Sequence, residues 1–519
     1  MIELYDTTLR DGTQQEGISL SVEDKLRVAQ TIDTLGVPYI EGGWPGANPK
    51  DTEFFKRCAA GELELVTAQL VAFGMTRKPG REAAGDSNLA ALLEARTPIV
   101  TLVGKSDIRH VTEAIGTTGE ENLAMLRSSF ALVVAEGRRA FYDAEHFFDG
   151  YRRDAEYALD ALRAAVDGGA DCVVLCDTNG GMLPDQVRRV VSDVMAQVGD
   201  QVQVGIHVHN DTDCAVANSL VAMDAGTTHV QGTINGLGER TGNANLSSLI
   251  PNLALKMGLQ GLVADGAMAK MTHVSHRVAE IMNQTPRANA AYVGHAAFAH
   301  KAGLHVSALA KNTDLYQHVD PASVGNELRL LVSELAGRAT VVLKGADMGL
   351  DLDGAVATKV LDEVKALEHL GYTFEAADAS FELLVRRQSG DMVERFTLES
   401  FRTIVERRED GRVVAEATVK VWVDDERLIG TGEGNGPVDA LDHAFRAAVA
   451  GRLGLEDLHL ADYKVRILDA GSGTGATTRV LITSSDSDRE YVTVGVDSNI
   501  IEASWRAMAD AYASHLREA

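Results

Sequence analysis

The segment QVGIHVHND, residues 203–211, decides how the first half of this 519-residue chain is interpreted. Its apolar residues predict a buried β-strand, and two histidines stand one residue apart near the end of that strand. Side chains at positions i and i+2 of a strand project to the same face, so His207 and His209 would aim both imidazoles at one point. Two convergent imidazoles are typical of a divalent-metal site. For this motif alone, the alternative is a pair of core histidines bonded to backbone carbonyls.

Similar apolar segments alternate with predicted helices from residue 1 to about 257. Eight strands are predicted, beginning at Ile2, Pro38, Leu63, Pro98, Arg139, Asp171, Gln203 and Thr228. A helix follows each strand; Ser21, for example, is a predicted N-cap, with Asp24 in the capping-box position and Gly36 as the stop signal. Eight strand–helix units favour a closed (β/α)₈ TIM barrel over an open doubly wound sheet, so the predicted fold class is α/β.

Two further parts are predicted after the barrel. The barrel is expected over residues 1–265, and a mostly helical linker region over residues 266–390 contains a polar, histidine-rich stretch. Residues 391–519 form long alternating strands around two helices, which predicts an α+β domain. Within this domain the segment from Thr431 is similar to the segment from Val494, so we expect two copies of one strand–strand–helix unit.

The composition argues against several classes of protein. A formal net charge of −26 disfavours nucleic acid or an anionic membrane as the main partner, because phosphate binding requires a basic surface. No apolar run reaches the roughly 18 residues that a membrane span requires, and the first residues lack a signal-peptide pattern. We therefore expect a cytoplasmic protein. The four cysteines, Cys58, Cys172, Cys176 and Cys214, have neither metal-ligand nor disulfide spacing, and we expect Cys172 and Cys176 to lie in the core.

Polar residues stand at the ends of several predicted strands, on the face that carries catalysis in TIM barrels. The first strand ends in DTTLRDG, so Asp11 can join His207 and His209, and the loop after the eighth strand offers the amide oxygen of Asn243. This mixed set of oxygen and nitrogen ligands suits Mn²⁺, Mg²⁺ or Zn²⁺, with positions left open for a substrate. A 2-oxo acid could chelate such an ion while Arg10 stabilises negative charge on the ketone oxygen. The structural alternative is an Arg10–Asp11 ion pair that only closes the barrel.

Three motifs carry a resemblance to a known family: DTTLRDG at residues 6–12, HVHND at residues 207–211 and GERTGNAN at residues 238–245. Together they resemble the 2-isopropylmalate, homocitrate and citramalate synthases, metal-dependent barrel enzymes that condense acetyl-CoA with a 2-oxo acid. The resemblance covers essentially the whole chain, including a C-terminal regulatory domain. The stretches DTTLRDGTQQEGISLSVEDK, YIEGGWPGANPKD and YDAEHFFDGY are most similar to the long bacterial citramalate synthases, which use pyruvate.

The resemblance implies a set of site residues at the positions that match the family motifs. The implied metal ligands are Asp11, His207, His209 and Asn243; the implied catalytic residues are Arg10, Glu145, His305 and Tyr316; and the implied substrate-binding residues are Arg10 and Thr178. In relatives, the counterparts of His305 and Tyr316 reach in from the neighbouring subunit. By position alone, Glu145 would be a solvated carboxylate and His305 a loop histidine. We add Leu102, on the fourth predicted strand, as a candidate for the substrate pocket.

The activity that the resemblance implies is condensation of acetyl-CoA with pyruvate, followed by thioester hydrolysis to citramalate and CoA. His305 and Glu145 would remove a methyl proton from the thioester. The resemblance also implies a homodimer with shared active sites and an amino-acid effector, isoleucine or leucine. Whether His305 acts in its own subunit, which metal binds and which residues hold CoA are left open by the sequence.

Other activities compete with this interpretation. The nearest is the same reaction on 2-oxoisovalerate, giving 2-isopropylmalate, because a pocket discriminates one methylene by only about 1–3 kcal/mol. A second is a metal-dependent lyase or aldolase, which is disfavoured because Glu239 and Arg240 stand in the loop where related acyl-CoA lyases have a cysteine. A third is a non-catalytic metabolite sensor, which is disfavoured because the chain retains the full set of implied ligands and catalytic residues.

Overall fold

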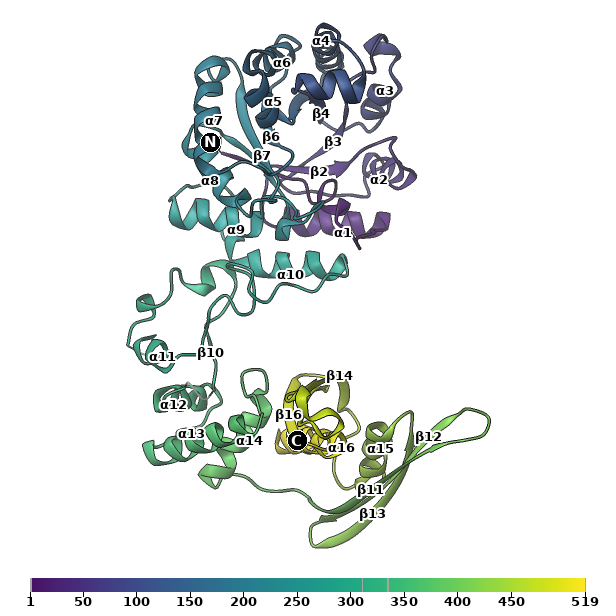
Figure 1. Ribbon diagram of the computed structural model, residues 1–519, viewed down its shortest axis with the longest axis vertical. Helices are drawn as coiled ribbons and strands as arrows, with labels where there is room; N and C mark the ends of the chain where they lie inside the picture. Colours follow the sequence, from purple (N-terminus) through teal and green to yellow (C-terminus); the bar gives the residue numbers. More distant parts are fainter. Residues whose placement is uncertain (1, 310, 334–335, 519) are drawn as a thin grey trace. The chain divides into compact units, whose positions relative to one another are not determined.

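The computed structural model describes residues 2–309, 311–333 and 336–518, which form two units (Figure 1). The first unit consists of Met1–Phe298 and Val319–Glu327, and the second of Ala299–His318 and Leu328–Ala519. Each unit has its own hydrophobic core, and each is described separately below.

The first unit is built on eight parallel strands that close into a barrel in chain order. The strands are β1 (Glu3–Asp6), β2 (Tyr39–Gly43), β3 (Gln69–Met75), β4 (Ile99–Lys105), β5 (Arg139–Glu145), β6 (Cys172–Asp177), β7 (Gln203–Val208) and β8 (His229–Gly232). The ring is completed by the pairing of β1 with β8, in which Glu3 lies opposite His229. The predicted TIM barrel is therefore confirmed.

The third strand begins later than its apolar sequence predicted, at Gln69 instead of Leu63. The reason is a competing set of hydrogen bonds. The backbone amides of Val66, Thr67 and Ala68 all donate to the carboxylate of Asp33, at 2.6, 3.1 and 2.7 Å. These amides are satisfied by a side chain, so the segment does not need a ladder to a neighbouring strand.

Helices surround this barrel, as Figure 1 shows. They are α1 (Val22–Asp33), α2 (Pro49–Ala59), α3 (Ser87–Glu94), α4 (Gly119–Ala135), α5 (Phe147–Arg153), α6 (Ala155–Asp167), α7 (Pro184–Val198), α8 (Ala215–Asp224) and α9 (Leu246–Pro251). The predicted capping box of α1 is confirmed: Ser21 Oγ accepts from the Asp24 amide, and the Asp24 carboxylate accepts from the Ser21 amide. A further helix, α10 (Met271–Ile281), packs against α1.

Side chains of the barrel strands alternate between two layers. The inner layer includes Tyr5, Tyr39, Val71, Ile99, Phe141, Cys172, Val174 and Cys176, and the outer layer packs against the helices. Both cysteines of β6 are buried, which confirms their predicted place in the core. Polar residues replace much of this apolar filling toward the C-terminal ends of the strands, and His229 at the start of β8 is also buried, in contact with Tyr5, Tyr39 and Phe141.

The second unit begins with short strands and helices and ends in two antiparallel sheets. Its first elements are β9 (Ala299–His300), α11 (Gly303–Leu309), β10 (Arg329–Leu330), α12 (Arg338–Asp347), α13 (Gly354–His369) and α14 (Asp378–Ser389). One sheet comprises β11 (Thr397–Arg407), β12 (Val413–Val423) and β13 (Glu426–Gly434), followed by α15 (Pro437–Val449). The other comprises β14 (His459–Ile467), β15 (Thr478–Ser485) and β16 (Glu490–Asp497), followed by α16 (Ile500–Glu518). The predicted helical region and α+β domain are confirmed.

The repeated unit has three strands and a helix, whereas the sequence predicted two strands and a helix. Gly432 and Gly495, which occupy matching positions in the two similar segments, lie within the third strands, β13 and β16. A Cβ at Gly432 would stand 2.5 Å from the backbone nitrogen of Ala444 on α15. At the matching residue of the second copy, Gly495, it would stand 2.0 Å from the oxygen of Ala503 on α16. The glycines therefore mark close packing of a helix on a strand.

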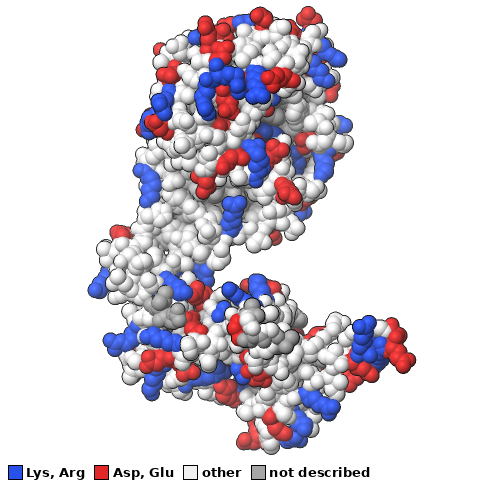
Figure 2. All heavy atoms as spheres, in the orientation of Figure 1, with Lys and Arg blue, Asp and Glu red and all other residues white. Residues whose placement is uncertain are grey.

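The distribution of surface charge and the length and polarity of the helices complete the description of the two units. On the face shown in Figure 2, acidic and basic side chains are interspersed over both units. Among the residues that the structure describes, no helix combines the length and the apolar character needed to cross a membrane.

Candidate metal centre and active site

Three predicted metal ligands meet at the C-terminal mouth of the barrel. Oδ2 of Asp11, in the turn after β1, lies 3.4 Å from His207 Nε2 and 3.7 Å from His209 Nε2, and the two imidazole nitrogens are 3.4 Å apart. All three side chains are buried. Ligand atoms that each stand about 2.1 Å from one cation are separated by about 3.0–3.4 Å. The cluster is therefore close to the size that a single divalent ion requires.

Unpaired buried atoms in this cluster test the fit further. Among the described side chains, Asp11 Oδ1, His209 Nδ1 and Asn243 Oδ1 are buried without a hydrogen-bond partner. Asn243 forms a β-bridge with His209, and its Nδ2 donates to the carbonyl of Leu237 at 3.0 Å, which leaves its oxygen free. Unpaired buried polar atoms are costly, and a cation at the cluster would accept lone pairs from the Asp11 carboxylate and from Asn243 Oδ1, while His209 would bind it through Nε2. The residues fit the predicted ion.

A chain of hydrogen bonds behind the ligands orients His207. Gln231 on β8 donates through Nε2 to Asp143 Oδ1 at 2.9 Å, and its Oε1 lies 2.8 Å from His207 Nδ1. Because the amide oxygen can only accept, Nδ1 carries the proton and Nε2 presents a lone pair toward Asp11. Sequence analysis missed Gln231 and Asp143. A signal was present, since each is a polar residue inside an apolar strand.

Arg10 is held beside the cluster by four groups. Its Nε donates to Glu41 Oε2 at 2.5 Å, one terminal nitrogen donates to Asp11 Oδ2 at 3.0 Å, and the other lies 4.0 Å from Asp143 Oδ2. The guanidinium also stacks on the Phe73 ring, 3.9 Å from its centroid. Burial raises the pKa of Asp11, but opposing effects, of which the adjacent Arg10 is the largest, hold that pKa well below its usual value.

Negative charge exceeds positive charge in this buried site. Three carboxyl groups, those of Asp11, Glu41 and Asp143, surround the single guanidinium of Arg10. Burial, together with the neighbouring Glu41, raises the pKa of Asp143 to about 6. A divalent cation between Asp11 and the histidines would balance the excess charge.

Glu145 and Thr178 lie at the same rim of the barrel: Glu145 is the last residue of β5, and Thr178 directly follows β6. The ammonium of Lys105, at the end of β4, is hydrogen-bonded to Glu145 Oε2. Thr178 Oγ1 accepts a 2.8 Å hydrogen bond from the amide of His146. Its own hydroxyl proton is therefore free to donate to another group.

Leu102 does not line this site, which corrects its assignment to the substrate pocket. It is fully buried in the layer between the barrel and the helices, on the outward face of β4. Thr101 faces inward, because its hydroxyl lies 2.7 Å from Tyr5 Oη in the barrel interior. Strand alternation then places Val103 and Lys105 on the inward face, so Val103 is the better candidate for contact with a substrate.

His305 and Tyr316 belong to the second unit, where they contact each other. Their rings are stacked with centroids 4.1 Å apart and planes 25° apart. His300 also contacts His305, with ring centroids 6.1 Å apart. The two predicted residues are therefore neighbours, and their catalytic roles stay predictions.

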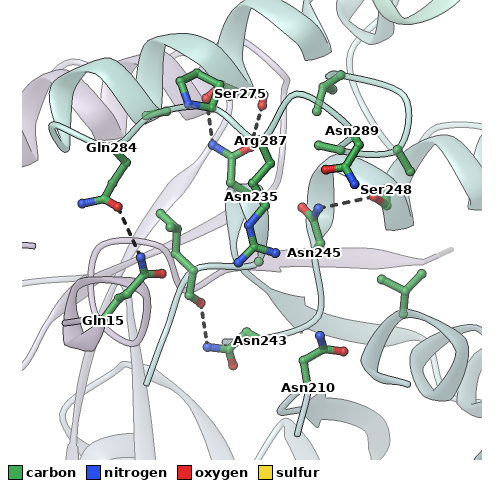
Figure 3. Close-up of a pocket in the computed structure, with 18 of the residues that line it drawn as sticks. Gln15, Asn210, Asn235, Asn243, Asn245, Ser248, Ser275, Gln284, Arg287 and Asn289 are labelled. Carbon is green, nitrogen blue, oxygen red and sulfur yellow. Dashed lines mark hydrogen bonds between the residues drawn. The ribbon is translucent and has the colours of Figure 1, made fainter. Parts of the chain in front are cut away.

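A cavity of about 370 Å³ in the first unit opens beside Asn243 (Figure 3). Primary amides dominate its wall: Gln15, Asn210, Asn235, Asn243, Asn245, Gln284 and Asn289. Arg287 adds one cationic side chain, which points in among these amides. Asp213 also lines the wall, so the cavity offers many hydrogen-bond donors and acceptors with one basic and one acidic side chain.

The fold and the site define a class of protein, a barrel enzyme with a divalent-metal site and an arginine next to it. Comparison with protein families gives the same class. The HMGL-like family matches residues 1–282, the homocitrate synthase post-HMGL domain-like family matches residues 292–371, and the LeuA allosteric (dimerisation) domain matches residues 375–516.

Individual relatives are similar over almost the whole chain. An (R)-citramalate synthase of Streptomyces coelicolor is 54% identical over 98% of this chain and 95% of its own. One of Aquifex aeolicus is 47% identical over 98% and 96%. A 2-isopropylmalate synthase of Methanocaldococcus jannaschii is 28% identical over 98% and 93%. The chain belongs to the HMGL-like family and, within it, to the group of the (R)-citramalate synthases.

Proposed function

We propose that this protein is a citramalate synthase that condenses acetyl-CoA with pyruvate and hydrolyses the thioester. The carrying observation is the buried Asp11–His207–His209 cluster with Arg10 bonded to it at 3.0 Å, in a chain 54% identical to an enzyme of that name. A divalent cation at this cluster, Mn²⁺, Mg²⁺ or Zn²⁺, would polarise the ketone of a bound 2-oxo acid.

Residues of the chain supply the remaining chemistry. Glu145, together with His305 and Tyr316, would take a proton from the methyl group of acetyl-CoA, and the new carbanion would form a bond to the ketone carbon. Arg10 would stabilise the negative charge that develops on the ketone oxygen before that oxygen is protonated. Thr178 would donate its free hydroxyl proton to the substrate carboxylate. Water then cleaves the thioester, giving a carboxylate and the CoA thiol.

We place acetyl-CoA in the amide-lined cavity beside Asn243. The arm of CoA contains two amide groups, which the side-chain amides of the wall can bind as donors and acceptors. Arg287 would pair with a phosphate. An Arg287→Gln variant should raise the KM for acetyl-CoA while leaving the KM for pyruvate unchanged.

A CoA-release assay with purified protein, Mn²⁺ or Mg²⁺, acetyl-CoA and a panel of 2-oxo acids tests the reaction and its substrate. We expect release with pyruvate and much less with 2-oxoisovalerate, the substrate of the rival 2-isopropylmalate activity. Val103 lies on the inward face of β4 by strand alternation, and it is the residue we would vary to alter this preference. The absence of CoA release with every 2-oxo acid would refute the proposal.

The match to an allosteric dimerisation domain supports a homodimer under allosteric control. We propose that the effector is isoleucine, more than leucine, because citramalate leads toward isoleucine in the resembling synthases. The proposed protein is cytoplasmic, and its chain divides near residues 265 and 390 into the barrel, the helical linker region and the C-terminal domain. Isoleucine should lower activity in the full chain, and ending the chain near residue 390 should remove this sensitivity. If millimolar isoleucine and leucine neither change the rate nor give a heat of binding, the C-terminal domain would serve only in dimerisation.

A further inference from the structure

Lys105 stands out among the charged groups at the mouth of the barrel, because the proposed reaction gives it no task. It is the last residue of β4, directly opposite Glu145 in the parallel pairing of β4 with β5. Its ammonium is bonded to Glu145 Oε2, and the two side chains are only 16% and 27% exposed. A cation is therefore fixed on one oxygen of the proposed proton-abstracting carboxylate.

The backbone around Glu145 is held without this ion pair. Ser106 Oγ donates to the carbonyl of Glu145 at 2.8 Å, and the Ser106 amide donates to the same oxygen at 3.3 Å. On the other side, the His146 amide donates to Thr178. The loop after β4 also packs tightly on α5, since a Cβ at Gly150 would stand 2.7 Å from the Ser106 oxygen. The backbone of the rim is therefore held by hydrogen bonds and packing that do not involve the Lys105 ammonium.

What the backbone leaves undetermined is the direction of the Glu145 carboxylate. A glutamate side chain has three rotatable bonds, and it loses reactivity if its oxygen is misplaced by about 1 Å. The bond from Lys105 occupies Oε2, whereas Oε1 lies 3.9 Å from His146 Nε2, beyond hydrogen-bond distance. Oε1 thus stays available for a proton while Oε2 is held.

We propose that Lys105 is a positioning residue, which holds Oε2 of Glu145 so that Oε1 stays directed at the proton it removes. This inference rests on the proposed function, in which Glu145 takes part in proton removal. The competing interpretations are a rim ion pair without a catalytic effect and direct binding of a substrate anion by the ammonium.

Steady-state kinetics of the full-length, Mn²⁺-loaded enzyme separates these interpretations. The variants are Lys105→Met, which keeps the aliphatic stem, Lys105→Arg, which keeps the charge, Glu145→Gln, and the Lys105→Met/Glu145→Gln double variant. We expect Lys105→Met to lower kcat on the order of 10²-fold, with little change in either KM, and Lys105→Arg to retain most of the rate. With trideuteroacetyl-CoA, the isotope effect on kcat should rise in Lys105→Met, because proton removal becomes slower.

The double variant shows whether Lys105 acts through Glu145. If it does, Lys105→Met/Glu145→Gln should be no slower than Glu145→Gln alone. Arg109→Gln is the matched control: it removes a nearby cation that pairs with Glu113 on the exposed surface, and it should behave as the wild type. Circular dichroism and bound Mn²⁺ confirm that each variant is folded, and Lys105→Gln replaces Lys105→Met if the latter is not.

Three results would overturn the inference or its basis, and they are distinguishable. Wild-type kcat in Lys105→Met beside an inactive Glu145→Gln would reduce the pair to a rim ion pair and leave the proposed function intact. A higher KM for pyruvate with unchanged kcat would make Lys105 a substrate-binding residue. Wild-type kcat in Glu145→Gln would instead remove the proposed role of Glu145, on which the inference rests.

Discussion

Replacing Gln231 by leucine tests how far the residues behind the metal ligands determine the site. Gln231 is fully buried on β8, with its Oε1 2.8 Å from His207 Nδ1 and its Nε2 2.9 Å from Asp143 Oδ1. Leucine keeps a similar volume and removes these hydrogen bonds, together with the 3.5 Å contact between Nε2 and His229 Nε2. The imidazole of His207 would then be free to rotate or to move its proton to the nitrogen that faces Asp11.

Gln231→Leu should lower the affinity for the metal, because Gln231 is the hydrogen-bond partner that orients the ligating His207. Removing the partner that orients a ligating histidine typically costs about 10–100-fold in metal affinity, or about 1.4–2.7 kcal/mol. The free energy of unfolding should also fall, because a buried imidazole N–H and a buried carboxyl lose their partners at about 1–3 kcal/mol each. The metal-free variant should therefore be less stable by about 2–6 kcal/mol.

Calorimetric titration of the metal-free protein with Mn²⁺ measures the loss of metal affinity, and urea denaturation measures the loss in the free energy of unfolding. Gln203→Leu is the matched control: Gln203 lies at the opposite end of β7, where it donates to Glu3 Oε2 at 3.1 Å and Thr228 Oγ1 at 3.2 Å. It should bind Mn²⁺ as the wild type does. A folded Gln231→Leu protein with wild-type Mn²⁺ affinity would refute the view that this glutamine orients His207.

Three further predictions concern the ion, the dimer and the loop after β8. His207→Ala should abolish CoA release and leave the circular dichroism spectrum unchanged, because a closed barrel does not depend on one ion; chelation that unfolds the protein before it inactivates it would contradict this. Glu145→Ala and His305→Ala homodimers should each be nearly inactive, whereas co-refolded mixed dimers should regain up to about a quarter of wild-type activity if the site is shared; mixed dimers without activity would contradict this. Gly242→Ala should weaken Mn²⁺ binding, because φ at Gly242 is 89° and a Cβ would stand 1.8 Å from a backbone oxygen. Gly17→Ala is the control and should bind Mn²⁺ normally, because φ is 84° but the space around the Cβ is open. Equal Mn²⁺ affinities of the two variants would argue against steric displacement of the loop after β8.

The sequence by itself determined the barrel, because the information is local. Apolar strand segments, helix caps such as Ser21 and polar residues at the ends of several strands can all be recognised within short stretches of sequence. The convergence of His207 and His209 followed from the same periodicity, since residues two apart share a face. Asp11 could be added because β1 and β8 must pair when eight strands close, which places β1 near β7.

The tertiary structure alone decided which face of each strand points inward. Because side chains alternate along a strand, Leu102 and Val103 must face opposite sides of β4. The sequence does not show which of them is inside, and the closed barrel places Val103 on the inward face. The Gln231–Asp143 chain and the Lys105–Glu145 pair likewise join residues of different strands. Their side-chain distances depend on strand register and on the packing of the whole barrel, which local periodicity does not encode.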